Sequence, residues 1–324
     1  MSNYLEGYPV EHVRVSTVAL VTNPKAGHGA AAHAAERAMD RFSERGVDVV
    51  ALQGKSPADA RRLIRTVLED GRIDALAVAG GDGMINLALQ EQAGTGVPLG
   101  IIPAGTGNDH GREYRLPRNN PEAAADVVAD GFAITTDLGR ILPIGDTGHP
   151  DEAQARWFGT IMCAGFDSLV SDRVNVMKWP HGRNRYNAAI VVEFLNFHAL
   201  PFRITLDDGT VIDERITLAA FGNTRSYGGG MKICPAADHS DGQLDITVIG
   251  KAGRLKAAAV FGKVFKGEHV HQPEVTQYRS PGALVEFFGG GNAMNAYADG
   301  DFMAPLPVRV EIAPAAGRYI VPRP

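Results

Sequence analysis

Two glycine-rich segments lie close together in the sequence, and their residue types could bind phosphate and a metal ion. The first is Gly-Gly-Asp-Gly at residues 80–83, and the second is Pro-Ala-Gly-Thr-Gly-Asn-Asp at residues 103–109. Each follows a short apolar run that predicts a buried parallel strand. Because ligands of open α/β sheets bind beyond the carboxyl ends of the strands, the two loops should form a phosphate-sized cleft with Asp82 and Asp109 on its floor. This arrangement indicates phosphoryl transfer.

The first loop has two interpretations. Its glycines would leave room for a triphosphate, and Asp82 could hold Mg²⁺ directly or through water. The alternative is a tight turn between strand and helix, with the Asp as a helix cap. The second loop on the next strand favours the functional interpretation.

A further phosphate site could lie at residues 22–29, between the first strand and the first helix. Backbone N–H groups at a helix start attract phosphate, glycines let it approach, and Lys25 would add a positive charge. The segment does not end in Gly-Lys-Ser/Thr, so it is not a Walker motif. An ordinary turn is the alternative.

The third candidate lies after the Tyr-Gly-Gly-Gly segment at residues 227–230. In the loop that follows, Asp238 and Asp241 are three residues apart, with backbone carbonyls nearby. Oxygen ligands of this kind suit a hard cation such as Mg²⁺. An Asp-rich turn before the next strand is the alternative.

The fourth candidate is Asp299-Gly300-Asp301, which follows a short strand. An Asp-Gly pair is usually a turn. An acid at this place could also act as the general base for a hydroxyl nucleophile.

Length and composition limit the class of protein. A chain of 324 residues favours about two domains, and 44% hydrophobic with 21% charged residues is typical of a soluble globular protein. The formal net charge of −5 argues against a nucleic-acid partner. The start of the chain does not resemble a signal peptide, and apolar runs fall short of the ~20 residues that span a bilayer. We therefore expect a cytoplasmic protein, with peripheral membrane contact allowed and with Cys163 and Cys234 as buried thiols.

Strands and helices alternate in the first part of the chain, which predicts a parallel sheet with right-handed crossovers. We expect strands at 18–21, 47–52, 75–79 and 98–102 and helices at 31–42, 57–68 and 85–90. After residue 132 the pattern indicates a mainly antiparallel domain with an Asp208-Gly209 hairpin turn. Its expected strands are 134–138, 157–163, 202–206, 216–221, 244–249, 284–288 and 308–312, with helices near 184–197 and 255–265. The apolar tail at 319–321 could pair with a sheet edge of the first domain.

Together these segments resemble the diacylglycerol kinase catalytic family, which includes bacterial lipid kinases, sphingosine kinases and ceramide kinases. The resemblance covers nearly the whole chain and follows the order of the family's motifs. The matching segments are Asn23-Pro24 with Gly27, residues 80–83, residues 103–109 with Arg112, Asp137-Leu138-Gly139, Gly165-Phe166-Asp167, and residues 227–242.

The resemblance implies an α/β N-terminal domain with a parallel sheet flanked by helices, of the phosphofructokinase and NAD kinase kind. It also implies a β-sandwich-like C-terminal domain. We expect residues 1–133 to bind the nucleotide, joined by the tail 303–324, and residues 134–302 to bind the lipid. The implied reaction transfers the γ-phosphoryl group of ATP, with Mg²⁺, to a lipid hydroxyl at a membrane surface. Diacylglycerol, giving phosphatidic acid, is the implied acceptor.

The resemblance also assigns roles to individual residues. Asp299 matches the general base, Asp82 would organise Mg²⁺ and water, and Asp109 and Arg112 would belong to the surrounding charged network. The implied nucleotide contacts are Asn23, Lys25, Gly27, Gly81, Asp82, Gly83, Gly105, Thr106, Asn108 and Asp301. The implied structural Mg²⁺ site consists of Asp238, Asp241 and a carbonyl near Gln243.

Two residues depart from the family pattern. Met84 stands where Thr or Ser is usual, which removes one phosphate hydrogen bond of about 0.5–1.5 kcal/mol. Asp301 stands where Glu is usual, so its contact with the nucleotide could pass through water.

Two other functions stay open. NAD kinases share the Gly-Gly-Asp-Gly loop and the two-domain plan, but their Asn-Glu motif is missing from the matching region. Met84 favours a weakly active nucleotide- or lipid-binding regulatory homologue. The late strands could also form the edge of a homodimer.

A membrane-docking edge is predicted at residues 178–186, which contain three basic residues, Trp179 and Tyr186, and no acid. Basic residues near anionic lipid contribute about 1 kcal/mol each, and Trp and Tyr favour the interface. The alternative is a solvated loop whose aromatic residues anchor the next helix.

Overall fold

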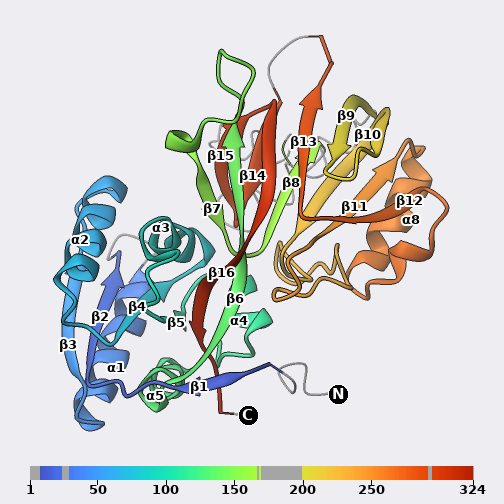
Figure 1. Cartoon of the computed structure of the whole chain (residues 1–324). Helices are drawn as coiled ribbons and strands as arrows, with labels where there is room; N and C mark the ends of the chain where they lie inside the picture. Colours follow the sequence, from blue (N-terminus) through green and yellow to red (C-terminus); the bar gives the residue numbers. More distant parts are fainter. Residues whose placement is uncertain (1–7, 24–28, 166–167, 169–198, 291–293, 324) are drawn as a thin grey trace. The chain divides into compact units, whose positions relative to one another are not determined.

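The computed structural model describes residues 8–23, 29–165, 168, 199–290 and 294–323 (Figure 1). The chain forms two compact units. Unit 1 comprises residues 1–138, 228–230 and 313–324, and unit 2 comprises residues 139–227 and 231–312. The sequence analysis placed the corresponding divisions after residues 133 and 302.

Unit 1 contains a parallel sheet in the order β3-β2-β4-β5. The strands are β2 (Thr17–Thr22), β3 (Asp48–Gln53), β4 (Ala75–Gly80) and β5 (Leu99–Pro103). The end of the last strand, β16 (Val308–Ile320), adds to β5 in parallel through Tyr319 and Leu99, as expected for the apolar tail. The short β1 (Val10–His12) pairs with the start of β6 (Phe132–Pro143).

Five helices accompany this sheet: α1 (Ala30–Glu44), α2 (Pro57–Asp70), α3 (Asp82–Gln92), α4 (Asp109–Glu113) and α5 (Pro121–Asp130). Helices α1 and α5 pack against one face of the sheet through Ala35, Phe42 and Val128. Because successive strand residues point to opposite faces, the remaining apolar strand residues face the other side. There α2 and α3 pack against each other and against the strands. The predicted start of α2 is confirmed, since Ser56 accepts the N–H of Asp59 at 3.2 Å.

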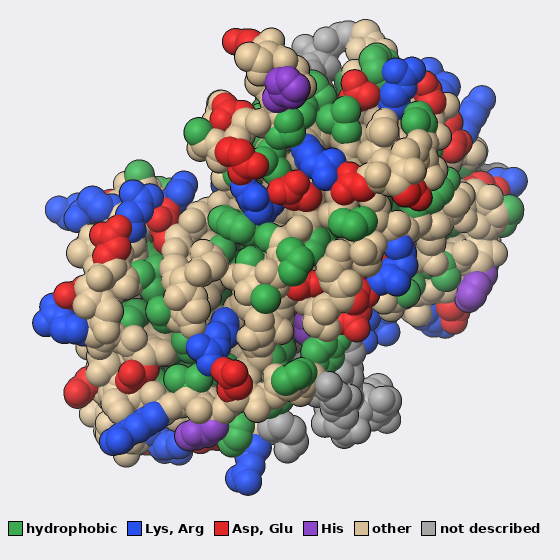
Figure 2. Space-filling view, in the orientation of Figure 1, with side chains coloured by type: hydrophobic (Ala, Val, Ile, Leu, Met, Phe, Trp, Pro, Cys, Tyr) green, Lys and Arg blue, Asp and Glu red, His purple; other side chains and the backbone are tan. Residues whose placement is uncertain are grey.

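The surface of unit 1 mixes both signs of charge. Figure 2 shows basic side chains gathered over α2, where Arg61 and Arg65 donate to Glu91 at 2.6 and 2.8 Å. On the α1 side, Arg41 and Arg45 share the carboxylate of Asp126 at 2.8 and 2.6 Å. These arginines are therefore paired with acids of neighbouring helices.

Unit 2 is built from antiparallel strands around an apolar core that contains Phe158, Phe202 and Phe221. Its strands are the end of β6, the start of β16, and β7 (Arg156–Phe158), β8 (Ile161–Gly165), β9 (Leu200–Leu206), β10 (Val211–Gly222), β11 (Leu244–Gly250), β12 (Val275–Ser280), β13 (Gly282–Phe287), β14 (Asn295–Ala298) and β15 (Asp301–Pro305). They pair in the order β15-β14-β8-β10-β9-β13-β16, and β11 joins β10 to β12. Helix α8 (Arg254–Val264) and the short η2 (Glu152–Gln154) and η3 (Glu268–His271) complete the unit.

The predicted fold class is confirmed, and so is the Asp208-Gly209 hairpin turn, where Gly209 has a φ of 87°. The single strand predicted at 157–163 is wrong. It is interrupted at Gly159 and Thr160, because the N–H groups of these two residues bond to Asp299 instead of a neighbouring strand.

The short strand expected before Asp299 is β14, whereas β1, β12, β15, α4 and α5 were not predicted. The helix predicted at 255–265 is α8, whereas the one at 184–197 lies outside the described residues. Cys163 and Cys234 are buried thiols, as expected. Within the part of the chain that the structure describes, no helix is long and apolar enough to cross a membrane.

Candidate active site

The two glycine loops of unit 1 contact each other backbone to backbone. The N–H of Ala104 donates to the carbonyl of Gly80 at 2.9 Å. A Cβ atom added to Gly105 would lie 2.4 Å from the Cα of Gly81, and one added to Gly81 would lie 3.0 Å from the Cα of Gly105. The contact between the loops therefore requires glycine at both positions, a reason the sequence analysis had not given.

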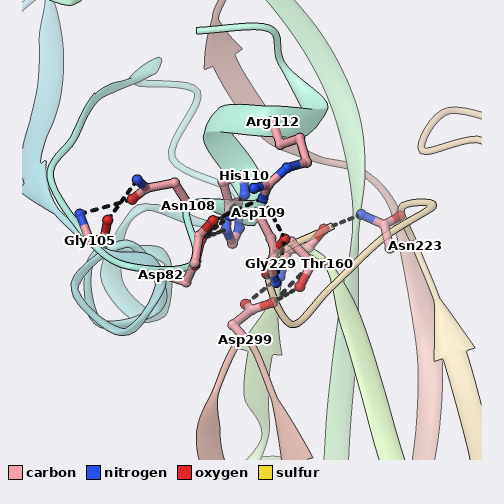
Figure 3. A network of polar contacts seen from close by, with 12 residues as sticks. Asp82, Gly105, Asn108, Asp109, His110, Arg112, Thr160, Asn223, Gly229 and Asp299 are labelled. Atoms are coloured by element: carbon pink, nitrogen blue, oxygen red, sulfur yellow. Dashed lines mark hydrogen bonds and ion pairs between the residues drawn. The ribbon is translucent and has the colours of Figure 1, made fainter. Parts of the chain in front are cut away.

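Asp82 joins the first loop to the helix that follows the second (Figure 3). Its Oδ1 accepts the N–H groups of Asp109 at 2.9 Å and His110 at 3.3 Å, and the His110 ring nitrogen Nδ1 lies 3.3 Å away. Burial has the largest effect on the pKa of Asp82 and raises it. The contacts with His110 and the backbone N–H groups outweigh burial, so the pKa is lower than usual. Asp82 is thus held as a carboxylate at the start of α4.

Asp109 is held by a different set of donors. The N–H of Gly229 donates to both of its carboxylate oxygens, at 2.9 and 3.1 Å, and Arg112 donates to Oδ1 at 3.0 Å. Arg112 also donates to the carbonyl of Gly107 at 2.9 Å. Burial, reinforced by the charge of Asp82, raises the pKa of Asp109 despite these donors. The neighbouring acids therefore differ in proton affinity.

Asn108 shapes the second loop through its own side chain. Its Oδ1 accepts the N–H of Gly105 at 2.9 Å and its Nδ2 donates to the carbonyl of Gly105 at 2.8 Å. Its φ of 54° lies in the left-handed region, which Asn tolerates. Thr106 in this loop and Gly83 in the first loop are exposed, which leaves them accessible to a ligand.

Asp299 lies in unit 2, in the two-residue turn between β14 and β15. Asp299 and Gly300 have φ values of 52° and 84°, as a tight hairpin requires. The Asp299 carboxylate accepts the N–H of Gly159 at 2.8 Å, the N–H of Thr160 at 2.9 Å and the hydroxyl of Thr160 (Figure 3). At Asp301, two residues after Asp299, burial and the charge of Asp299 raise the pKa. The charge of Arg156 lowers it but does not outweigh them.

The third candidate group forms a small acidic cluster in unit 2. Asp238 accepts the N–H of Ser240, Asp241 accepts the N–H of Gln243 at 3.0 Å, and Arg279 donates to Asp241. Burial has the largest effect on the pKa of Asp245 and raises it; Arg279 lowers it, and the charges of Asp241 and Asp238 raise it further.

The negative charge of the three carboxylates Asp238, Asp241 and Asp245 would suit a hard cation such as Mg²⁺. Three carboxylates act on one another, and Arg279 is the cation that pairs with Asp241 and lies 3.5 Å from Asp245. Across the described ranges, no three His, Cys, Asp or Glu side chains converge to hold a metal ion. Mg²⁺ commonly takes one or two carboxylates and completes its shell with water and carbonyl oxygens, so the metal site of Asp238, Asp241 and Gln243 stays a prediction.

Several predicted residues lie outside the described residues: Lys25, Gly27, residues 166–167 and the docking segment 178–186. Asn23 is half-buried just beyond β2. Sequence reasoning gave no role to His110, Gly229, Thr160 or Asn223. Gly229 and Asn223 lie in or beside the Tyr-Gly-Gly-Gly block, and His110 follows Asp109 directly. No motif or spacing around Thr160 indicated a functional role.

Two family models and several known proteins match this chain. Residues 17–141 match the family model "Diacylglycerol kinase catalytic domain", and residues 160–321 match "YegS C-terminal NAD kinase beta sandwich-like domain". A diacylglycerol kinase of Mycobacterium tuberculosis (strain H37Rv) is 50% identical over 309 residues, which cover 95% of this chain and 96% of the relative. The diacylglycerol kinase of Bacillus subtilis (strain 168) is 24% identical over 292 residues, covering 89% of this chain and 90% of the relative.

A solved structure supports the fold alone. The crystal structure of a diacylglycerol kinase from Bacillus anthracis str. Sterne superposes with a TM-score of 0.67 and 20% identity, covering 95% of this chain and 97% of that one.

Proposed function

The chain belongs to the diacylglycerol kinase family, and we propose that it transfers the γ-phosphoryl group of ATP to the free hydroxyl of diacylglycerol, giving phosphatidic acid. The observation that carries this proposal is the 50% identity, over 95% of the chain, to the diacylglycerol kinase of Mycobacterium tuberculosis. The proposal further includes dependence on Mg²⁺ and a cytoplasmic location at the membrane surface, because the acceptor resides in a bilayer.

In this proposal unit 1 binds the nucleotide. Gly83 in the first turn of α3 and Thr106 in the second loop are exposed, and N–H groups at a helix start favour phosphate. Asp82 and Asp109 would hold the metal ion, which neutralises charge on the transferring phosphoryl group. Arg112 keeps Asp109 and the Gly107 carbonyl in place. The lowered pKa of Asp82 keeps it ionised over the neutral range.

Unit 2 supplies the proposed general base. The carboxylate of Asp299 would take the proton of the lipid hydroxyl as its oxygen attacks the γ-phosphorus. A base can do this only from a fixed position within hydrogen-bond reach of the hydroxyl. The donors from Gly159 and Thr160 fix the carboxylate in that way. Asp238, Asp241 and the Gln243 carbonyl would hold a structural Mg²⁺.

The test is to incubate the purified chain with Mg²⁺, γ-labelled ATP and mixed micelles of diacylglycerol, sphingosine, ceramide or monoacylglycerol, with NAD as a further acceptor. We expect label in phosphatidic acid, and no label when Mg²⁺ is chelated. Label in another lipid would correct the acceptor. Label in NAD alone would replace the lipid kinase by an NAD kinase. No label in any acceptor, with ATP bound in calorimetry, would favour a regulatory homologue.

A further inference from the structure

The segment that holds Asp299 is fixed from two sides. Gly159 and Thr160 lie between β7 and β8, and both of their N–H groups point to the Asp299 carboxylate. Their carbonyl groups bond to residues after β10: the Asn223 side chain donates to Gly159 at 2.9 Å, and the N–H groups of Asn223 and Thr224 donate to Thr160 at 2.9 and 3.2 Å. The N–H groups of Gly159 and Thr160 thus bind Asp299, while their carbonyl groups hold this segment to the residues that follow β10.

The whole arrangement is buried. Thr160 is 1% exposed, Asn223 is 0% exposed and Asp299 is 6% exposed. A carboxylate in such a place needs hydrogen-bond donors, because each polar group that loses its partner there costs about 1–3 kcal/mol. Two backbone N–H groups and one hydroxyl donate to Asp299. Because a substitution does not remove a backbone N–H group, only the hydroxyl among these three donors can be removed by changing a side chain. That side chain is Thr160.

The Thr160 hydroxyl binds one particular oxygen of the Asp299 carboxylate. Oδ1 of Asp299 accepts both the N–H and the Oγ–H of Thr160, whereas Oδ2 accepts the N–H of Gly159. Asp299 also has a φ of 52°, a backbone conformation that non-glycine residues adopt only where the surroundings favour it. The Thr160 hydroxyl therefore adds a second donor at Oδ1, beside the two N–H groups that hold the carboxylate plane on a backbone fixed by the turn.

We propose that Thr160 is a positioning residue of the phosphoryl transfer, whose hydroxyl orients the Asp299 carboxylate toward the acceptor hydroxyl. The proposal rests on the proposed function, because it assigns Thr160 a role through the general base. Asp301 at the start of β15 and Arg156 of β7 are charged groups beside this turn, and Arg156 donates to the Phe302 carbonyl at 2.6 Å.

The test compares Thr160→Val, which removes the hydroxyl at nearly constant shape, with Thr160→Ser, which keeps it. We expect Thr160→Val to lower kcat about 10- to 100-fold, the value of one hydrogen bond to a charged group, with the KM for ATP unchanged. Because a lost donor favours the protonated acid, the acidic limb of the pH–rate profile should move to higher pH. Thr160→Ser should stay within about threefold of the unaltered protein, well inside the span of one such hydrogen bond.

A matched control is Thr247→Val. Thr247 is also fully buried in unit 2, and its hydroxyl donates to the carbonyl of Ile233 at 2.8 Å, away from Asp299. It should lower the melting temperature without moving the pH profile. An unchanged kcat and pH limb in Thr160→Val would overturn the proposal, and so would a Thr160→Ser variant as impaired as Thr160→Val.

A second measurement separates this inference from the proposed function. The Asp299 carboxyl carbon, labelled with ¹³C and assigned by its absence from the spectrum of Asp299→Asn, can be observed by NMR at pH 7 without turnover. We expect its chemical shift to change in Thr160→Val, which loses the hydroxyl donor, and to stay constant in Thr160→Ser and Thr247→Val. A chain without kinase activity that shows this change would refute the proposed function and retain the contact between Thr160 and Asp299. An unchanged chemical shift in Thr160→Val would refute the contact in an active or inactive chain.

Discussion

The backbone N–H of Asp109 donates to the carboxylate of Asp82 across 2.9 Å, so the acid of one glycine loop holds the helix that follows the other loop. The two carboxylates are thereby close enough for the charge of one to change the pKa of the other. His110 stabilises the charge of Asp82, and that charge in turn makes Asp109 harder to ionise. Loop geometry and the ionisation of the two acids are therefore coupled through the same pair of residues.

This coupling predicts that the stability of the unaltered protein relative to Asp109→Asn falls as the pH rises through the raised pKa of Asp109. The folded-state pKa of Asp109 is raised above its ordinary value of 3.8. Its contribution to stability is therefore present below pH 3.8 and is lost as the pH rises through the raised value. Asn removes this cost but cannot hold the metal ion, so kinase activity should fall about 10²-fold. Melting temperatures at several pH values, with a phosphorylation assay, test both effects.

Asp82→Asn is the matched variant, and the stability of the unaltered protein relative to it should change with pH in the opposite direction. The lowered pKa of Asp82 contributes stability above pH 3.8 that is lost as the pH falls through the folded-state value. At neutral pH the variant should lose about 0.3–1 kcal/mol, typical of a negative charge at a helix start. A stability difference between Asp109→Asn and the unaltered protein that does not change with pH in this way would contradict the coupling.

Gly105→Ala should separate the two glycine loops. The added methyl group would lie 2.4 Å from the Cα of Gly81, and backbone cannot yield as a flexible side chain can. We expect a loss of about 1–3 kcal/mol in the free energy of unfolding and a higher KM for ATP. Gly262→Ala is the control, since a Cβ there meets open space on helix α8 and should add about 0.5–1 kcal/mol. Urea denaturation measures both, and equal stability of the two variants would refute the contact.

The sequence predicted the parts of this site that depend on strand order. Asp82 and Asp109 follow neighbouring parallel strands, and such strands end at the same edge of a sheet, so their proximity followed from the alternation of strands and helices. Asp299 was identified by family resemblance together with the Asp-Gly turn signal. Residue type and strand order together were thus sufficient for Asp82 and Asp109.

The sequence could not predict which donors hold these acids. Thr160 contacts Asp299 across 139 residues of chain, and it looks like an ordinary strand residue in the sequence. The break between β7 and β8 arises because Asp299 takes two N–H groups from a strand that local pattern would continue. Long-range competition for backbone hydrogen bonds leaves no periodic signal in a single sequence.

Asp241→Asn should weaken the response of unit 2 to Mg²⁺. A bound ion stabilises by mass action, about 2.7 kcal/mol at 100 times its dissociation constant, so Mg²⁺ should raise the melting temperature of the unaltered protein. Asp241→Asn should lose most of this rise while keeping ATP affinity. Asp213→Asn is the control, because Asp213 forms a similar surface pair with Arg203 at 2.9 Å but has no role in the acidic cluster. A full Mg²⁺ response in Asp241→Asn would exclude the structural metal site.

Asp299→Asn should separate nucleotide binding from turnover. The amide keeps the shape of the side chain but places an NH₂ group against the N–H of Gly159 or the donors of Thr160, so one contact becomes repulsive. We expect kcat to fall about 10²–10⁴-fold, as for a lost general base, and stability to fall about 1–3 kcal/mol, with ATP affinity unchanged in calorimetry. Asp208→Asn is the control, since it alters the other Asp-Gly hairpin, where the carboxylate accepts the N–H of Thr210 at 2.8 Å on the surface. If the folded Asp299→Asn variant had the same kcat as Asp208→Asn, Asp299 would not be the general base and would only stabilise the hairpin.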